Sequence, residues 1–200
     1  MRIAVHEARA LPAGLAAQVA ALEAQAWPGS APGHDPALRP KSVLLLAQDG
    51  SVLASLALLY KPVRLADGRT YRAAGLSGVV TRADVRGRGH GARLVAAARA
   101  ELAADPAVDL ALFSCDRDLV PFYGAAGFEV LPGTVLVGGT PQDPLATDAP
   151  GFAKTVLAAF FAGAGAGAGA GDDEGRTDQV RTAFTGIRVP LHPGTIDRLW

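Results

Sequence analysis

The chain has little cysteine, few aromatic residues and no excess of charge of either sign. Its 200 residues include one cysteine, so no intrachain disulfide can form, and a reducing, cytoplasmic location is expected. Cys115 ends an apolar run and is expected to be a small buried hydrophobe. Nineteen basic residues balance nineteen acidic ones, which argues against a nucleic-acid partner. The length suggests a single domain with a sizeable core.

Long hydrophobic runs are also missing. The uncharged segment Thr155–Gly171 is short for a membrane span, and its second half alternates alanine with glycine. Glycine at that density favours a flexible loop, so an Ala/Gly-rich insertion is expected at about residues 162–175. Ala10–Leu22 imitates a secretory signal, but Glu7 precedes it and its apolar residues recur at helical spacing. No membrane association is therefore expected.

Periodicity and turn signals divide the chain into alternating strands and helices. The turns Asp49-Gly50 and Asp67-Gly68 join successive strands as antiparallel neighbours. Residues 28–41 are expected to be a loop with room for a short helix. Strands are expected at Arg2–Ala8, Val43–Gln48, Val52–Lys61, Tyr71–Arg82, Asp109–Ser114, Glu129–Val137 and Arg181–Pro190, and helices at Leu11–Trp27, Gly89–Ala104 and Leu119–Ala126.

A glycine-rich stretch is the strongest local signal. Gly87, Gly89 and Gly91 alternate with Arg86, Arg88 and a histidine just before an amphipathic helix. Glycines adopt positive φ angles and let several backbone N–H groups converge on one anion. The following helix adds the positive end of its dipole. The stretch therefore predicts a phosphate-binding loop.

Two other interpretations fit the same glycines. Gly87, Gly89 and Ala92 match the dinucleotide fingerprint, and Asp109 follows about twenty residues later, as that fingerprint requires. However, the fingerprint belongs near the start of a parallel sheet, whereas the strands upstream are connected by hairpins. The second alternative is a glycine-rich loop that merely caps a helix.

Two motifs together point to a known superfamily. Arg86-x-x-Gly89-x-Gly91 resembles the first signature of the GNAT acyl-CoA-dependent N-acyltransferases, and the segment from Phe122 to Phe128, Phe-Tyr-x-x-x-Gly-Phe, resembles the second. They occur in the order of that superfamily, with a helix and a strand between them. The resemblance covers about residues 3–139. It implies an α/β fold with a central mixed, mostly antiparallel sheet flanked by helices, as one domain over residues 1–200.

The resemblance implies acetyl-CoA as co-substrate, a small-molecule amine as acceptor, and no metal. A β-bulge near Ser77-Gly78 is expected to separate its strand from the Asp109–Ser114 strand, since a glycine inside a strand suggests a bulge. The backbone N–H of Val79 is the candidate that polarises the thioester carbonyl, and the ring of His90 is expected to face solvent. The residues expected to bind acetyl-CoA are Val79, Val80, Thr81, Arg86, Gly87, Arg88, Gly89, His90, Gly91 and Ala92.

Tyr123 is the candidate general acid, because a phenol can give its proton to a departing thiolate. Its alternative is a helix residue that packs under the sheet. The general base is less obvious, because Ser77 stands where related enzymes often carry a glutamate. Ser77 and Ser114 are candidates to align the amine or a water, and Glu23 and Asp35 are carboxylates that could serve instead.

The chain most resembles the aminoglycoside 2′-N-acetyltransferases within the superfamily. The resemblance rests on the Gly78–Gly87 stretch, Ser114 and the terminal Trp200. It implies that Asp35, Asp197 and the Trp200 carboxylate bind a cationic sugar, although Trp200 also fits a simple hydrophobic plug.

Other functions stay open. They are nodulation-type or protein N-acyl transfer, and a non-catalytic acyl-CoA-binding module. Apolar strands near the C-terminus also suggest a homodimer.

Overall fold

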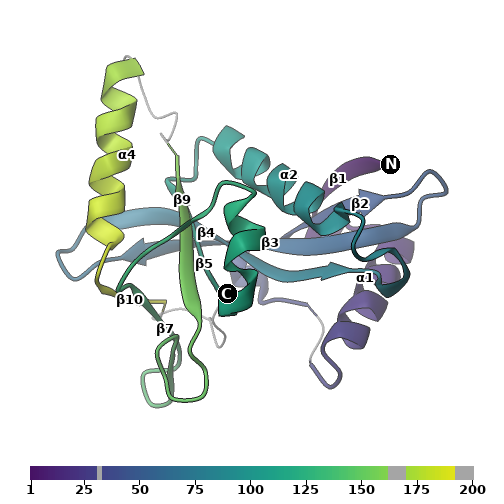
Figure 1. Ribbon diagram of the computed structural model, residues 1–200, viewed down its shortest axis with the longest axis horizontal. Helices are drawn as coiled ribbons and strands as arrows, with labels where there is room; N and C mark the ends of the chain where they lie inside the picture. Colours follow the sequence, from purple (N-terminus) through teal and green to yellow (C-terminus); the bar gives the residue numbers. More distant parts are fainter. Residues whose placement is uncertain (31–32, 162–169, 192–200) are drawn as a thin grey trace.

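The structure is a computed structural model that describes residues 1–30, 33–161 and 170–191 (Figure 1). Seven strands form the main sheet in the order β1-β2-β3-β4-β5-β9-β6, and all neighbours are antiparallel except β4 and β5. A second sheet has the order β10-β7-β8. The mixed, mostly antiparallel sheet that the resemblance implied is confirmed.

The main-sheet strands are β1 (Arg2–Glu7), β2 (Lys41–Leu46), β3 (Val52–Arg64), β4 (Thr70–Thr81), β5 (Leu110–Cys115), β9 (Thr155–Phe160) and β6 (Glu129–Val130). The second sheet holds β7 (Val135–Gly139), β8 (Pro144–Ala146) and β10 (Arg188–Pro190). The helices are α1 (Ala13–Ala26), α2 (His90–Ala104), α3 (Val120–Gly124) and α4 (Ala170–Phe184), with short 3-10 helices η1 (Ala8–Ala10), η2 (Pro36–Leu38), η3 (Ala83–Val85) and η4 (Arg117–Leu119).

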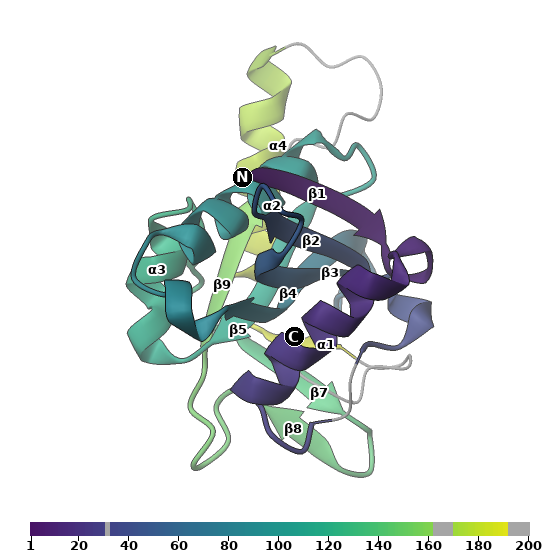
Figure 2. The ribbon, with the colours of Figure 1, turned by 90° about the vertical axis from the view of Figure 1, so that its right-hand side faces the viewer.

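The two longest helices of the N-terminal part cover opposite faces of the main sheet. In Figure 1, α2 lies above the sheet and α1 below it, and Figure 2 shows α1 crossing in front of the strands. The apolar side chains of α2 belong to the larger core cluster, and those of α1 to a separate, smaller one. The predicted α2 stripe is confirmed, since all four of its members are completely buried: Leu94, Val95, Ala98 and Leu102.

Strands β4 and β5 pair only at their first residues and then separate. The parallel register links Ala73 with Leu110 and Ala74 with Ala111, and no further pair follows. The bulge predicted near Ser77-Gly78 is confirmed on the other edge of β4, where two residues, Gly78 and Val79, face one residue of β3. Gly78 has a φ of +59°, a left-handed conformation that suits glycine. The bulge turns β4 away from β5 and opens a gap between them.

An ion pair between β4 and the residue before β5 lies at the end of the gap where the two strands still pair. The Asp109 carboxylate accepts hydrogen bonds from the backbone N–H of Arg72 (2.8 Å), from its Nε (3.1 Å) and from its Nη2 (2.6 Å). Burial by itself would raise the pKa of Asp109, but the bonds from Arg72 outweigh it and hold that pKa below its ordinary value.

The position of Asp109 also excludes the dinucleotide interpretation. Asp109 precedes β5, whereas the glycine-rich loop follows the far end of β4. Asp109 and the loop therefore lie at opposite ends of the two parallel strands. The fingerprint requires both at the carboxyl ends of the strands, where the acid would meet the ribose.

The C-terminal part departs from the sequence predictions in two places. The single strand expected at Glu129–Val137 is wrong, because Pro132 and Gly133 (φ +71°) interrupt it, and β6 and β7 enter different sheets. Strand β9 was not predicted. Beyond Thr155 it is apolar and buried on both faces, because it lies between β5 and β6, so it shows no polar alternation.

The strand expected at Arg181–Pro190 is wrong over its first part, which belongs to α4. Val180 and Phe184 are buried four residues apart, which is helical spacing, and the ring of Phe184 contacts Tyr71 edge-on at 5.1 Å. Of the insertion expected at 162–175, residues 162–169 lie outside the described residues and the remainder is the start of α4, not a loop. None of the helices in the described ranges is long and apolar enough to cross a membrane.

We expect Asp109→Asn to lower the free energy of unfolding by about 2 kcal/mol, the usual cost of losing hydrogen bonds to a charged group. The folded-state pKa of Asp109 is lowered, so its contribution is present above the unfolded value of about 3.9 and is lost as the pH falls through the folded value. Urea unfolding at pH 7 and pH 3 measures this, and the difference between the two proteins should be smaller at the lower pH.

Asp67→Asn is the matched control, because Asp67 pairs with Arg69 on the exposed surface and should contribute little to stability. Equal losses in the two variants would contradict a special role for Asp109.

Candidate functional site

The glycine-rich loop joins the end of β4 to the start of α2. Gly87 and Gly89 have φ angles of +75° and +76°, and Gly89 is the residue directly before the helix. Gly91 is required for a different reason. A Cβ there would lie 3.1 Å from Thr81 Oγ1 and 3.4 Å from Phe122 Cζ. The loop therefore needs glycine twice for conformation and once for the close approach of α2 to β4 and α3.

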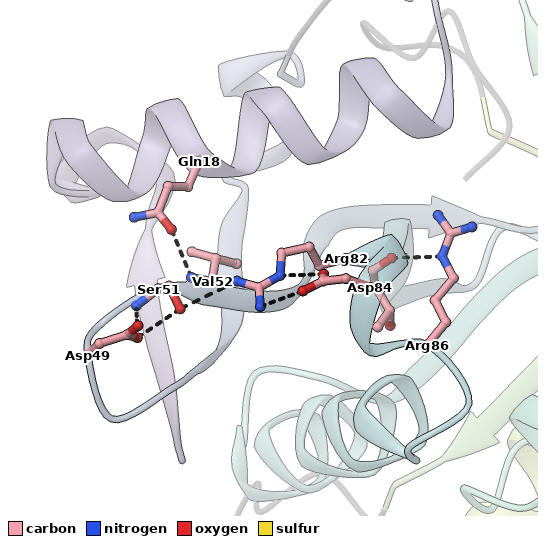
Figure 3. Close-up of polar contacts among 8 residues, drawn as sticks. Gln18, Asp49, Ser51, Val52, Arg82, Asp84 and Arg86 are labelled. Atoms are coloured by element: carbon pink, nitrogen blue, oxygen red, sulfur yellow. Dashed lines mark hydrogen bonds and ion pairs between the residues drawn. The ribbon is translucent and has the colours of Figure 1, made fainter.

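Two arginines near this loop have different roles. Arg82 forms a two-pronged ion pair with Asp84, at 2.7 and 3.0 Å, and braces the turn after β4 (Figure 3). Arg86 donates from Nε to the carbonyl of Thr81 at 3.0 Å, which holds its guanidinium over the end of β4. Arg82 is thus part of the scaffold, whereas Arg86 contributes positive charge at the mouth of the loop.

A pocket of about 420 Å³ lies between the loop, β4 and α3. All of its lining residues are predicted site residues except Leu119 and Phe122. Phe122 could have been found as part of the Phe-Tyr motif, whereas exposed Leu119 carries no signal in the sequence. His90 lines the pocket and is half-buried, not solvent-facing as expected. The lining is Val79, Thr81, Arg86, Gly87, Gly89, His90, Gly91, Ala92, Leu119, Phe122 and Tyr123.

Tyr123 fits both roles considered for it, a core residue and a general acid, since it is buried and also lines the pocket. Its side chain packs edge-on against Phe113 and Phe122, with ring centroids 5.0 and 4.9 Å away. Burial, with smaller contributions from the charges of Cys115 and Asp116, raises the pKa of Tyr123 to about 12. The phenol is therefore protonated at neutral pH and can act only as a proton donor or hydrogen-bond partner.

Ser77 and Ser114 lie beside the same gap, but on the face of the sheet opposite the pocket. Ser77 is opposite Ala57 in the sheet and shares its face with Val80, which packs in the α1 cluster. Continuing the β4–β5 register from Ala73 and Leu110 brings Ser114 level with Ser77, although the strands no longer pair there. Neither serine lines the pocket that holds Tyr123. The gap thus has two sides, one lined by α2 and α3 and the other facing α1.

These features match a known family. A family model described as an acetyltransferase (GNAT) domain matches residues 7–131. The chain belongs to this family. The segment beyond residue 131, with the second sheet, β9 and α4, lies outside the match. No curated protein matches the chain.

Solved structures share the GNAT fold at low sequence identity. The Escherichia coli GNAT family N-acetyltransferase YhbS in complex with CoA has a TM-score of 0.58 at 16% identity, with 96% of this chain and 89% of that one covered. An aminoglycoside 6′-N-acetyltransferase complexed with coenzyme A has a TM-score of 0.54 at 13% identity (80% and 97% covered). Arabidopsis thaliana NAA60 with a bisubstrate analogue has 0.52 at 10% (82% and 100%). Likeness at these identities concerns the fold alone and gives the 2′ resemblance no support.

The remaining predicted residues are not brought to the GNAT pocket. Val80 is buried beneath α1, and Arg88 is exposed and does not line the pocket. Asp35 accepts a hydrogen bond from the backbone N–H of Ala37 at 2.8 Å and caps η2, so its carboxylate has a local structural role. Asp197 and Trp200 lie outside the described residues.

Proposed function

We propose that this GNAT domain transfers an acetyl group from acetyl-CoA to a primary amine of a small molecule, by direct attack while both are bound. The observation that carries the proposal is the pocket itself. Its lining includes both the glycine-rich loop and Tyr123, whose phenol is protonated at neutral pH. A phosphate-binding loop and a proton donor are the two groups that a CoA thioester requires.

The loop end of the pocket would hold the pyrophosphate. The N–H groups of the loop and of the first turn of α2 are the donors, and the helix dipole favours negative charge there. Arg86, already held by Thr81, supplies a nearby positive charge with little further loss of side-chain freedom. Arg88 is exposed and would contribute longer-range attraction.

The bulge would present the thioester with a hydrogen-bond donor. A bulge leaves one residue of its strand outside the regular ladder, so a backbone N–H is turned away from the neighbouring strand. Val79 is a bulge residue and lines the pocket. Its N–H is our candidate for stabilising the negative charge that develops on the carbonyl oxygen as the amine attacks.

Tyr123 would then supply the proton for the leaving group. The amine nitrogen forms a bond to the carbonyl carbon, the carbon–sulfur bond breaks, and the sulfur takes the phenolic proton. The new amide nitrogen releases one proton, which reprotonates the phenolate. A phenol with a raised pKa is a weaker acid than usual, but it is fully protonated and ready to donate at every physiological pH.

The acceptor is best sought among cationic amines, with aminoglycosides and other aminosugars first. The test is release of free CoA from acetyl-CoA in the presence of kanamycin, spermine, glycine or a short peptide. Turnover with one class supports the proposal and identifies the acceptor. Tight binding of acetyl-CoA with no turnover on any amine would overturn it in favour of a non-catalytic binding module.

We expect Gly89→Val to lower the affinity for coenzyme A at least about 10-fold, because a β-branched residue disfavours the left-handed conformation that aims the loop at its ligand. Isothermal titration with coenzyme A measures this. Gly50→Val is the matched control. Gly50 has a φ of +84° in the β2–β3 turn, away from the pocket, so it bears the same strain without the loss of binding. A shared loss of affinity would contradict the phosphate-binding loop.

Tyr123→Phe should keep the ring packing and the affinity for coenzyme A while lowering kcat by about 100-fold or more, the usual contribution of a general acid. Steady-state CoA release and calorimetry check the two quantities separately. The wild-type rate should show no decline near pH 10, where an unperturbed tyrosine would ionise. Unchanged kcat in the variant would remove Tyr123 from the chemistry and leave it a core residue.

A further inference from the structure

A carboxylate from α1 lies against the bulge of β4. A Cβ on Gly78 would be 3.3 Å from Oε1 of Glu23, so the carboxylate reaches the backbone of the bulge itself. The two residues are far apart in sequence and meet only because α1 crosses β4 at this point (Figure 2). Glu23 is also the only ionisable residue within α1.

The neighbours of Glu23 hold it in this place. Leu22 is buried in the cluster between α1 and the sheet. One turn earlier, Oε1 of Gln18 accepts from the backbone N–H of Val52 at 2.8 Å, which ties α1 to the first residue of β3 (Figure 3). A helix fastened by both contacts has a defined rotation and height over the sheet, so the backbone of Glu23 has a defined place beside the bulge.

The carboxylate lies on the opposite side of the gap from Tyr123. Ser77 and Val80 flank the bulge on the α1 face, whereas Val79 and Tyr123 line the pocket on the α2 and α3 side. With the α2 and α3 side taken by the donor in its pocket, the α1 side is left for the amine that attacks the thioester carbonyl. The α1 face is therefore the face on which the incoming nitrogen must lose its proton.

We propose that Glu23 is the general base for the acceptor amine. This inference rests on the acetyl transfer proposed above. The bound ammonium gives one proton to the Glu23 carboxylate, and the neutral nitrogen then gives its electron pair to the carbonyl carbon while the leaving sulfur takes the proton of Tyr123. The new amide nitrogen releases its second proton, which restores the one on Tyr123, and Glu23 returns its proton to water. Ser77, on the same face, would orient the amine by hydrogen bonding.

The surroundings of Glu23 suit this role. Burial raises the pKa of Glu23 above the ordinary value of a glutamate, which makes it a stronger base. α1 packs on β3 and β4, and the ionisable residues of these strands on the same face are Lys61 and Tyr71. Lys61 pairs with Ala73, which precedes Ser77 by four residues and lies about 13 Å from it along β4. His6 of β1 shares the face but lies three strands away.

Glu23→Gln keeps the shape of the side chain and removes its basicity. We expect kcat at pH 7 to fall about 100-fold, with the affinity for coenzyme A and the melting temperature unchanged. In the wild type, kcat should rise with pH through a pKa above that of an ordinary glutamate. The variant should lack this step and rise only at higher pH, where the amine itself loses its proton in solution. Glu101→Gln on α2 is the control, because Glu101 faces Lys41 and lies outside the pocket; it should behave as wild type.

A comparison of acceptors separates a base from a merely structural residue. An α-amine with a pKa of about 8 is partly deprotonated in solution at pH 7, whereas an alkyl amine with a pKa of about 10.4 is not. Glycylglycine and ethylamine are suitable probes for acetylation by wild type and variant. The variant should lose less activity on the first than on the second, and should approach the wild-type rate as the pH rises. An equal loss on both, or an unchanged pH profile, would overturn the assignment.

The outcomes also distinguish this inference from the function beneath it. If the wild type acetylates an amine and Glu23→Gln does so at the same rate with the same pH profile, the acetyl transfer stands and Glu23 is not its base. If the wild type binds acetyl-CoA but acetylates no amine, the proposed function is overturned and the assignment of Glu23 with it.

Discussion

The divergence of β4 from β5 is the constraint on which the rest of this structure depends. Two paired positions and the Arg72–Asp109 ion pair hold the strands together at one end, and the bulge at Gly78 turns β4 away at the other. A sheet that continued its pairing would have no interior backbone available to a ligand. Here the separated strands expose it from both faces, and the helices on those faces supply the side chains.

Each face contributes a different kind of chemistry to the same gap. The α2 and α3 side carries the glycine-rich loop and a buried phenol, which together suit an anionic thioester and its leaving group. The α1 side carries a half-buried carboxylate, which suits a cationic amine. Burial raises the pKa of both Tyr123 and Glu23, with opposite uses: the phenol stays protonated as a donor, and the carboxylate becomes a better acceptor.

Local signals in the sequence were enough for the parts of the site that are local in the chain. Each of these signals reflects a backbone or packing requirement within a few residues: the glycines around Gly89, the apolar stripe that begins at Leu94, and the glycine at the bulge. Strand β9 could not be recognised, because a strand buried on both faces has no alternating pattern. Helix α4 was misassigned because the expected strand Arg181–Pro190 alternates, whereas Val180, whose spacing to Phe184 favours a helix, lies just before it.

The placement of Glu23 shows why the proposed base was the hardest residue to predict. Its proposed role depends on the crossing of α1 over β4, which is set by Gln18 bonding to β3 and by apolar packing, not by any motif around residue 23. On the same face, β4 carries Ser77 and no acid. Two carboxylates on this face beside one bulge would repel each other, and burial would push one of them to its neutral form. A single carboxylate reaching the bulge from α1 meets the chemical need, so the strand position is left to a side chain that can orient an amine without adding charge.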